Sequence, residues 1–215
     1  ANFVSGTCSV AWPVAMHLAR YICDHPELVR GRRAVELGAG IGLVGAAAAA
    51  LGAARTVVTD CGVALPLLER NRARLAEDGV KVEVAQCDWG SDADHAAILA
   101  AEVPGFEGPP AFDVILASDV IIAGFHTDRL FASVLALLAR HRDAKVVLAY
   151  EFREEWETIG TFVGWCEEAG LAVSHQKLPR PGDGEEGDED SDDDDSYMLL
   201  YTFWWPSDAA CLKAL

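Results

Sequence analysis

Two patterns of apolar residues, one typical of strands and one typical of helices, alternate along the first 180 positions of the chain. Short apolar or alternating runs, typical of buried strands, cover residues 33–37, 55–59, 80–87, 112–117 and 145–150. Segments with apolar residues three or four positions apart, typical of amphipathic helices, cover residues 13–22, 41–51, 63–78, 130–138 and 156–166. Because strands and helices take turns, the pattern predicts an α/β fold with a doubly wound, mostly parallel, Rossmann-like sheet.

The end of the chain departs from this alternation. Residues 171–178 and 197–205 have the character of strands, and the segment between them is too polar to pack as a crossover helix. These two strands should pair antiparallel and complete a seven-stranded sheet with a C-terminal hairpin. Residues 182–196 would form a disordered acidic loop at the tip of the hairpin, away from the glycine-rich turn described below.

Composition supports a single domain over residues 1–215 that begins with a helical segment at residues 1–30. Of the 215 residues, 51% are hydrophobic, which suffices for one substantial core, and no apolar run is long enough to span a membrane. The six cysteines are scattered, without the spacing of a metal site. We therefore expect reduced thiols, no bound metal, and a cytoplasmic or nuclear location.

Negative charge is concentrated in the predicted acidic loop. The net charge is -17, and residues 183–195 hold ten acidic residues and no basic one, which leaves -7 for the rest of the chain. A phosphate-binding face would need clustered lysine and arginine, so we expect no nucleic-acid partner. We also expect no membrane partner and a monomeric chain.

The turn after the first strand carries the strongest chemical signal. Its sequence, AVELGAGIGLVG at residues 34–45, has glycines at 38, 40 and 42. Glycine lets the backbone bend sharply and approach a ligand with no Cβ in the way, and the helix that opens near Ile41 presents free N–H groups. We predict that Gly38, Ala39 and Gly40 bind a cofactor.

Glu36 discriminates between two cofactors. Residues 40–45 also fit the GxGxxG dinucleotide pattern, but a pyrophosphate would repel a carboxylate two positions before Gly38. S-adenosylmethionine carries a sulfonium and an ammonium group and no phosphate, so an acidic residue there is electrostatically favourable. The residues favour S-adenosylmethionine, with a dinucleotide or a tight turn without a ligand as the alternatives.

Polar or aromatic residues follow each of the first four strands. Parallel sheets bind ligands at the carboxyl ends of their strands, so these residues should gather at one edge. Asp60 would bind the ribose hydroxyls and Asp88 the adenine amino group. Trp89 would cover the adenine face, and the backbone near Ser118 would close the pocket. Trp12 is either a wall of this pocket or an anchor in the core.

Together these motifs resemble the seven-β-strand protein-lysine methyltransferases, the non-SET group that acts on chaperones, elongation factors and related proteins. The shared segments lie between about residues 4 and 150: VAWP, VELGAGIGLVG, VVTD, LLERN, CDWG and FDVILASDVI. The resemblance implies contacts to S-adenosylmethionine from the following residues: Trp12, Gly38 to Gly40, Asp60, Trp89 and Ser118. It also implies that Asp119 opens the motif that faces the acceptor amine.

The resemblance implies an enzyme that transfers a methyl group from S-adenosylmethionine to a lysine side chain of a protein substrate. One position departs from the family, which commonly has Asp-x-x-Tyr after the fourth strand, because Ile122 stands where the tyrosine would be. A small-molecule amine or a protein histidine is therefore an alternative acceptor. A non-catalytic module that binds the cofactor and recruits a basic partner is a further alternative.

Overall fold

The structure, a computed structural model, describes residues 9–100, 111–152, 156–178 and 197–207. The strands in these ranges are β1 (Arg33–Leu37), β2 (Arg55–Asp60), β3 (Glu83–Gln86), β4 (Val114–Ser118), β5 (Lys145–Glu151), β6 (Ala172–Lys177) and β7 (Met198–Trp204). The helices are α2 (Pro13–Asp24), α3 (Leu43–Ala50), α4 (Leu65–Glu77), α5 (Asp92–Ala100), α6 (Thr127–Leu138) and α7 (Glu157–Glu168), with a short 3₁₀ turn, η1 (Pro26–Leu28).

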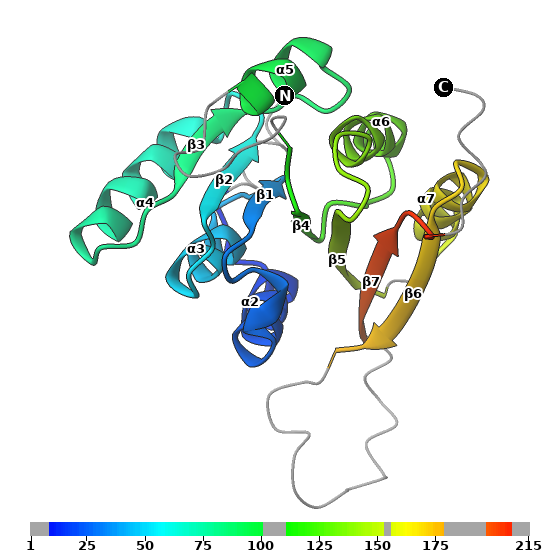
Figure 1. The fold of residues 1–215 in the computed structure, drawn as a ribbon, viewed down its shortest axis with the longest axis horizontal. Helices are drawn as coiled ribbons and strands as arrows, with labels where there is room; N and C mark the ends of the chain where they lie inside the picture. Colours follow the sequence, from blue (N-terminus) through cyan, green and yellow to red (C-terminus); the bar gives the residue numbers. More distant parts are fainter. Residues whose placement is uncertain (1–8, 101–110, 153–155, 179–196, 208–215) are drawn as a thin grey trace, which may run out of the picture.

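The strands form one seven-stranded sheet in the order β3-β2-β1-β4-β5-β7-β6 (Figure 1). β1 pairs parallel with β2 and β4, and the parallel pairing continues to β3 on one side and β5 on the other. β7 lies antiparallel between β5 and β6. The predicted fold, a mostly parallel doubly wound sheet closed by an antiparallel hairpin, is confirmed.

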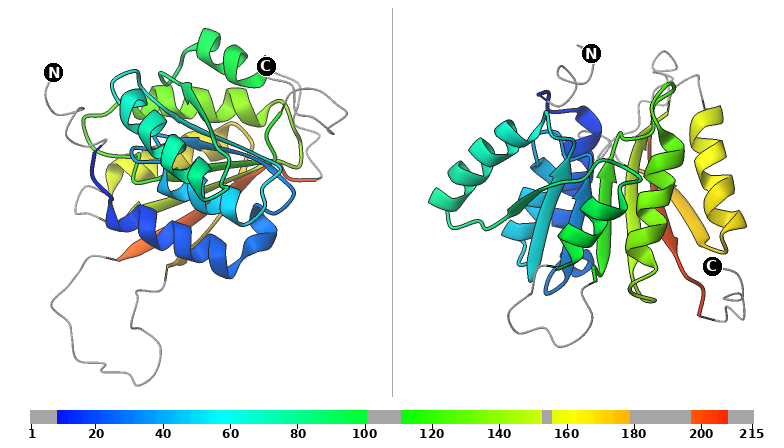
Figure 2. Two further views of the ribbon diagram at one scale, coloured as in Figure 1. Left: turned by 90° about the vertical axis from the view of Figure 1, so that its left-hand side faces the viewer. Right: turned by 90° about the horizontal axis from the view of Figure 1, so that it is seen from above.

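Helices cover both faces of this sheet, α2, α3 and α4 on one face and α5, α6 and α7 on the other (Figures 1 and 2). Neighbouring residues of a strand point to opposite faces of the sheet and pack in different hydrophobic clusters. Val58 of β2 packs in a cluster with Leu68 of α4, whereas Val57 belongs to the cluster that contains Ile98 of α5. β1 and β2 are buried along their whole length, as expected of parallel strands covered on both sides.

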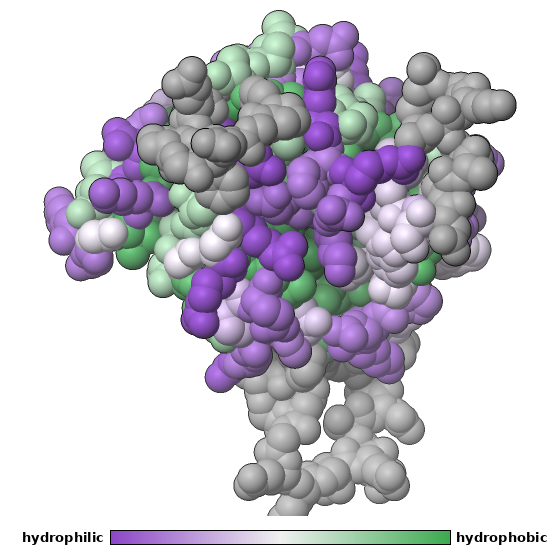
Figure 3. All heavy atoms as spheres, in the orientation of Figure 1, coloured by the Kyte–Doolittle hydropathy of each residue, from purple (hydrophilic) through white to green (hydrophobic). Residues whose placement is uncertain are grey.

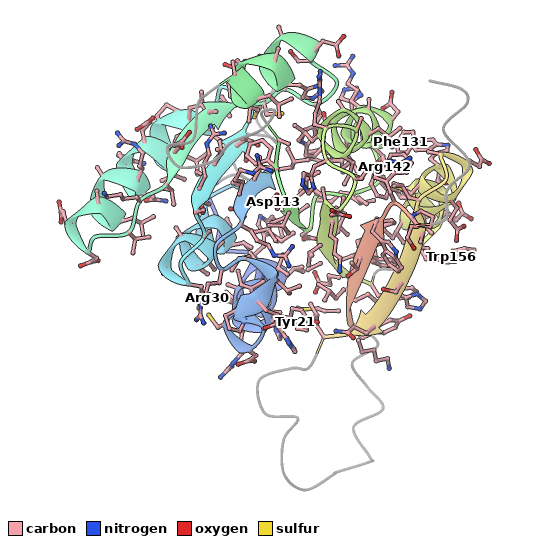
Figure 4. The ribbon with its side chains drawn as sticks, in the orientation of Figure 1. Tyr21, Arg30, Asp113, Phe131, Arg142 and Trp156 are labelled. Carbon is pink, nitrogen blue, oxygen red and sulfur yellow. The ribbon has the colours of Figure 1, made fainter. Side chains whose placement is uncertain are left out.

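An ion pair joins the starts of β1 and β4, at the edge of the sheet where the parallel strands begin. Arg33 Nη2 lies 2.9 Å from Asp113 Oδ1, and the Arg33 backbone N–H donates to Asp113 Oδ2 over 2.7 Å. Burial alone would raise the pKa of Asp113, but the hydrogen bonds and charge of Arg33, with a contribution from His141, hold that pKa below its usual value. Asp113 lies between β1 and β4 in Figure 4.

Several predicted boundaries differ from the structure by a few residues, and two of these differences have a clear local cause. The helix after the glycine turn begins at Leu43, not near Ile41, because Gly42 is its N-cap with a φ of 79°. The third strand covers only Glu83–Gln86, because the residues before it complete the end of α4: the Val80 N–H donates to the Leu75 carbonyl over 2.9 Å.

The two ends of the β6–β7 connection lie at the carboxyl ends of the parallel strands, which is also the end of the sheet that carries the glycine turn. Leu178 N–H donates to the Met198 carbonyl over 2.9 Å, and Glu151 at the end of β5 pairs with Met198. Laterally, β4 and β5 separate β1 and its glycine turn from the hairpin, so the two ends of the connection lie toward the far edge of the sheet, as expected. The predicted disorder of residues 182–196 concerns residues outside the described ranges.

The surface is hydrophilic over most of the face seen in Figure 3. Within the described ranges, the exposed large hydrophobic side chains are Val10, Met16, Val63 and Trp156. No helix in those ranges is both long and apolar enough to cross a membrane.

Candidate functional site

The glycine turn between β1 and α3 is bent at three positive φ angles, 64° at Gly38, 54° at Gly40 and 79° at Gly42. Side chains crowd its first residue: a Cβ at Gly38 would lie 2.7 Å from Val120 Cγ1 and 3.2 Å from Trp89 Cζ2. Glycine is therefore required at position 38 for both its conformation and its lack of a side chain. The turn brings the backbone close to the loops that follow β3 and β4.

Glu36 lies behind this turn. Its side chain is 1% exposed, and one carboxylate oxygen accepts the Gly45 N–H over 2.7 Å in the first turn of α3. Burial raises the pKa of Glu36 from 4.5 to about 8, against the lowering effect of the Gly45 hydrogen bond. Glu36 is absent from the residues that line the cavity between the strand ends. Its location supports a structural role at the start of α3, and the direct cofactor contact predicted for it has no support in this geometry.

Asp60 ties the turn to the end of β2. Its Oδ2 accepts the Gly40 N–H over 2.8 Å, and its Oδ1 accepts the Cys61 N–H over 2.7 Å. Asn71 of α4 donates to the Ile41 carbonyl over 2.9 Å, so α4 is also tied to the turn. A carboxylate can accept more than two hydrogen bonds, so these contacts are compatible with a ligand hydroxyl at Asp60.

A cavity of about 110 Å³ opens at the carboxyl ends of β1, β2 and β4. The described residues that line it are Val10, Trp12, Ala15, Gly38, Ala39, Gly40, Ile41, Asp60, Trp89, Ser118, Asp119, Val120, Ile122 and Phe125. They include eight of the ten residues predicted from the sequence: Trp12, Gly38, Ala39, Gly40, Asp60, Trp89, Ser118 and Asp119. Two carboxylates and no lysine, arginine or histidine are among them, so the lining favours a cation over a phosphate.

Asp88 lies in a second, adjoining cavity of about 330 Å³, which shares Trp89 and Phe125 with the first. Its other lining residues are Cys61, Cys87, His126 and Arg129. Burial raises the pKa of the Cys87 thiol to about 12, so this thiol stays protonated at neutral pH. We refer to the two cavities together as the cleft.

Asp119 has an unusual backbone. It is the only non-glycine residue with positive φ in the described ranges, at 54°, and its side chain is 7% exposed. Its N–H donates to the Ala149 carbonyl of β5 over 2.9 Å, which continues the pairing of Ser118 with Ala149. Aspartate tolerates the left-handed region better than most residues, and such conformations gather at functional sites.

The sequence did not reveal the apolar half of the cleft. Val10, Ala15, Ile41, Val120 and Phe125 line it, and none carries a polar group that would distinguish it from a core residue. The expectation that the chain holds no metal stays a prediction. In the described ranges, no three histidine, cysteine, aspartate or glutamate side chains gather as they would around a metal ion.

The fold and the cleft define a class I methyltransferase, which uses S-adenosylmethionine. A solved structure with this fold, magnesium protoporphyrin IX methyltransferase from Synechocystis with bound S-adenosylmethionine, matches with a TM-score of 0.54 at 14% identity. The match covers 95% of this chain and 85% of that one. At this identity the match shows the fold.

The chain belongs to the lysine methyltransferase family, whose sequence model matches residues 2–165. It is 28% identical to the protein N-terminal and lysine N-methyltransferase EFM7 of Candida glabrata and 33% identical to the mouse protein N-lysine methyltransferase METTL21A. These matches cover 88% and 75% of this chain, and 73% and 68% of the two relatives. The chain spans only 54% of a third relative, the protein-lysine N-methyltransferase EFM3 of Chaetomium thermophilum, at 26% identity over 85% of the chain.

Proposed function

We propose that this lysine methyltransferase binds S-adenosylmethionine along the cleft and methylates a lysine side chain of a protein substrate. The observation that carries the proposal is the chemistry of the smaller cavity. Asp60 and Asp119 are both more than nine-tenths buried there, and no basic side chain accompanies them among the described lining residues. Such a lining attracts a sulfonium and an ammonium group and disfavours a pyrophosphate.

The residues present fit the cofactor part by part. Asp60 has acceptor sites for the two ribose hydroxyls, and the glycine turn allows close approach of the ligand to the backbone. Trp89 stands between the two cavities, where its indole offers a face for adenine. Asp88, in the larger cavity, accepts from the adenine amino group. When bound, the cofactor supplies an electrophilic methyl group.

The acceptor end of the cleft combines one carboxylate with apolar walls. Asp119 shares it with Ile122 and Phe125. A lysine near pKa 10.4 must lose its proton before it attacks, which costs about 4 kcal/mol at pH 7.4, and apolar surroundings lower that cost by disfavouring the charged amine. Asp119 orients the amine through its carboxylate, and positioning supplies much of the remaining rate enhancement.

Ile122 gives a second acceptor some support. An isoleucine in the cavity cannot hydrogen-bond to an incoming amine as a tyrosine would. The Candida relative is named for both N-terminal and lysine methylation. Because Ile122 replaces the tyrosine, a small-molecule amine or a protein histidine is the alternative acceptor for this chain, and identification of the methylated product separates these cases.

We propose further that the enzyme acts as a monomer in the cytoplasm, and that its substrate is neither nucleic acid nor a membrane. Cys23, Cys61, Cys87 and Cys166 are free thiols, as favoured by a reducing compartment. The net charge of -17 repels polyanions and attracts basic protein surfaces.

Incubation of a cell lysate with the enzyme and a labelled methyl donor tests the acceptor. We expect label on a protein, at a lysine side chain. Asp60→Ala is the matched control, since it removes the ribose contact and should weaken donor binding at least tenfold in calorimetry, from two hydroxyls worth about 1 to 3 kcal/mol each. Label on a histidine, on nucleic acid or in the small-molecule fraction would contradict the proposal, and so would wild-type donor affinity in a folded Asp60→Ala variant.

A further inference from the structure

A buried polar pair outside the cleft contacts the turn that carries Trp89. The Gly90 N–H donates to Ser133 Oγ over 2.9 Å, and Ser133 Oγ lies 2.9 Å from His95 Nε2. His95 on α5 is 4% exposed, and Ser133 on α6 is fully buried. Neither residue is among those that line the two cavities. Their polar groups therefore act on the turn and not directly on a ligand.

The direction of these hydrogen bonds determines which nitrogen of the neutral His95 ring carries the proton. Ser133 Oγ accepts from Gly90, and the single hydroxyl proton needs an acceptor because the side chain is fully buried. His95 Nε2 is at hydrogen-bond distance, so it accepts, and the neutral ring carries its proton on Nδ1. That nitrogen has no hydrogen-bond partner among the described atoms and lies 4.0 Å from Asp92 Oδ1.

The bonded turn is the one that sets the position of Trp89. Gly90 has a φ of 80°, and a Cβ there would lie 3.3 Å from Cβ of Arg129 on α6. The turn therefore lies in close contact with α6, beside the hydrogen bond between Gly90 and Ser133. Asp94 of α5 fixes its other end by accepting the Asp88 N–H over 2.8 Å. With both ends held, the Trp89 ring stays against the glycine turn, where a Cβ at Gly38 would lie 3.2 Å from it.

We propose that His95 and Ser133 are positioning residues for the methyl donor: they hold Gly90 against α6 so that the Trp89 indole stands in the wall of the cleft, and protonation of His95 releases this hold. The inference rests on the proposed contact between Trp89 and the donor. A proton on Nε2 turns this nitrogen from an acceptor into a donor, so the buried hydroxyl proton of Ser133 loses its acceptor. This unsatisfied donor destabilises the bonded arrangement, and the hydrogen bond from Gly90 to Ser133 weakens with it.

The charged groups around His95 define the pH range. Asp92 and Asp94 on its own helix act on the imidazole, and the turn and α6 packed beside it carry Asp88 and Arg129. Burial lowers the pKa of His95 below its usual 6.5, although Asp92 and Asp94 act to raise it. Release of the turn is therefore expected only below pH 6.5.

Four variants test the pair by calorimetric titration with S-adenosylmethionine at pH 7.5. His95→Leu and Ser133→Ala remove the link, and both should weaken donor binding at least fivefold. His95→Gln keeps an acceptor oxygen close to the position of Nε2 and should bind the donor within twofold of wild type. His175→Leu, on the exposed strand β6, is the matched control for the histidine-to-leucine change and should leave donor binding unchanged.

Two readouts separate positioning from general stability. At saturating donor, the rate of methyl transfer by Ser133→Ala should stay within threefold of wild type, because only the donor site is disturbed. As the pH falls from 7.5 to values well below 6.5, donor affinity should fall more in wild type than in His95→Gln. Wild-type affinity in Ser133→Ala, equal weakening in His95→Gln and His95→Leu, or identical pH curves would each overturn the proposal.

Trp89→Ala distinguishes this inference from the proposed function. If that variant binds the donor like wild type, the proposed contact between Trp89 and the donor is wrong, and so is the positioning role of His95 and Ser133 that rests on it. If Trp89→Ala binds weakly while Ser133→Ala binds normally, only the positioning role of the pair is wrong, and the assignment of the cleft stands.

Discussion

Glu36 shows how one buried acid makes stability depend on pH. Its pKa is raised from 4.5 to about 8, so between these two values the folded protein binds more protons than the unfolded chain. The contribution is fully present below pH 4.5 and is lost as the pH rises through 8, at up to about 1.4 kcal/mol per pH unit. Alkaline conditions should therefore destabilise the fold through this residue.

Glu36→Gln should remove this dependence, because the amide does not ionise and its oxygen still accepts from Gly45. Between pH 6 and pH 9, we expect the Tm of wild type to fall by at least about 3 °C more than that of the variant. Thermal melts at one-unit pH intervals measure the difference. Parallel curves would mean that Glu36 is ionised in the folded protein throughout this range.

Asp119 is expected to affect turnover more than donor affinity. Asp119→Asn is the informative change, since asparagine tolerates the φ of 54° and removes only the charge. The catalytic rate on a lysine substrate should fall tenfold or more, while the donor Kd stays within about threefold of wild type. Asp119→Ala at the same site adds backbone strain and serves as the comparison. An equal loss of rate and of donor affinity in Asp119→Asn would make Asp119 a cofactor ligand.

At the scale of elements, α3 depends on a glycine inside its first turn. A Cβ at Gly45 would overlap Val58 Cγ1 and would lie 2.9 Å from a Glu36 oxygen. Gly45→Ala should therefore destabilise the protein by about 1 to 3 kcal/mol. Gly164 in α7 is the matched control, because a Cβ added there would meet nothing within 4 Å and its φ is ordinary.

Gly164→Ala should stabilise the protein by about 0.5 to 1 kcal/mol, from helix propensity alone. Chemical denaturation of the two alanine variants compares them under the same conditions. A stable Gly45→Ala variant would show that α3 can move away from β2 without cost.

Element order and pairing were predictable because they follow from hydrophobic periodicity. Both strands of the final hairpin were found in this way, and so were the polar residues at the strand ends. The location of Glu36 was not anticipated, although the alternation of side chains along a strand could have predicted it. Val35 and Leu37 belong to the cluster under α5 to α7, so Glu36 must point to the opposite face of the sheet, where α3 begins. The apolar walls of the cleft were missed because Phe125 and Val120 come from loops without periodicity.

At the scale of the whole molecule, negative charge is concentrated in one segment of the sequence. Ten acids between residues 183 and 195 account for most of the net charge of -17, leaving -7. The described strands on either side of this segment are already paired, with Lys177 opposite Leu199. A short turn can therefore close the hairpin.

Replacing residues 182–196 by a short Gly-Ser turn should leave the Tm within a few degrees of wild type and leave donor binding intact. If the acids steer a basic substrate, the variant should methylate it more slowly at low salt, and the difference should vanish at high salt, because salt screens charges over about 8 Å at physiological strength. Kinetics at several salt concentrations decide this. A variant that fails to fold would show that the segment is structural, and equal kinetics at every salt concentration would exclude it from recognition.

The position of β7 has a consequence for synthesis on the ribosome. β7 is made after the other six described strands, yet it lies inside the sheet, and among the described strands β6 pairs only with β7. Until Met198–Trp204 has emerged, β5 keeps an open edge and β6 lacks its pairing partner among the described strands, although those other strands are already made. An open edge is a template for pairing with other chains. The nascent protein is therefore especially exposed to aggregation just before β7 is translated, and termination before Met198 would release an aggregation-prone chain.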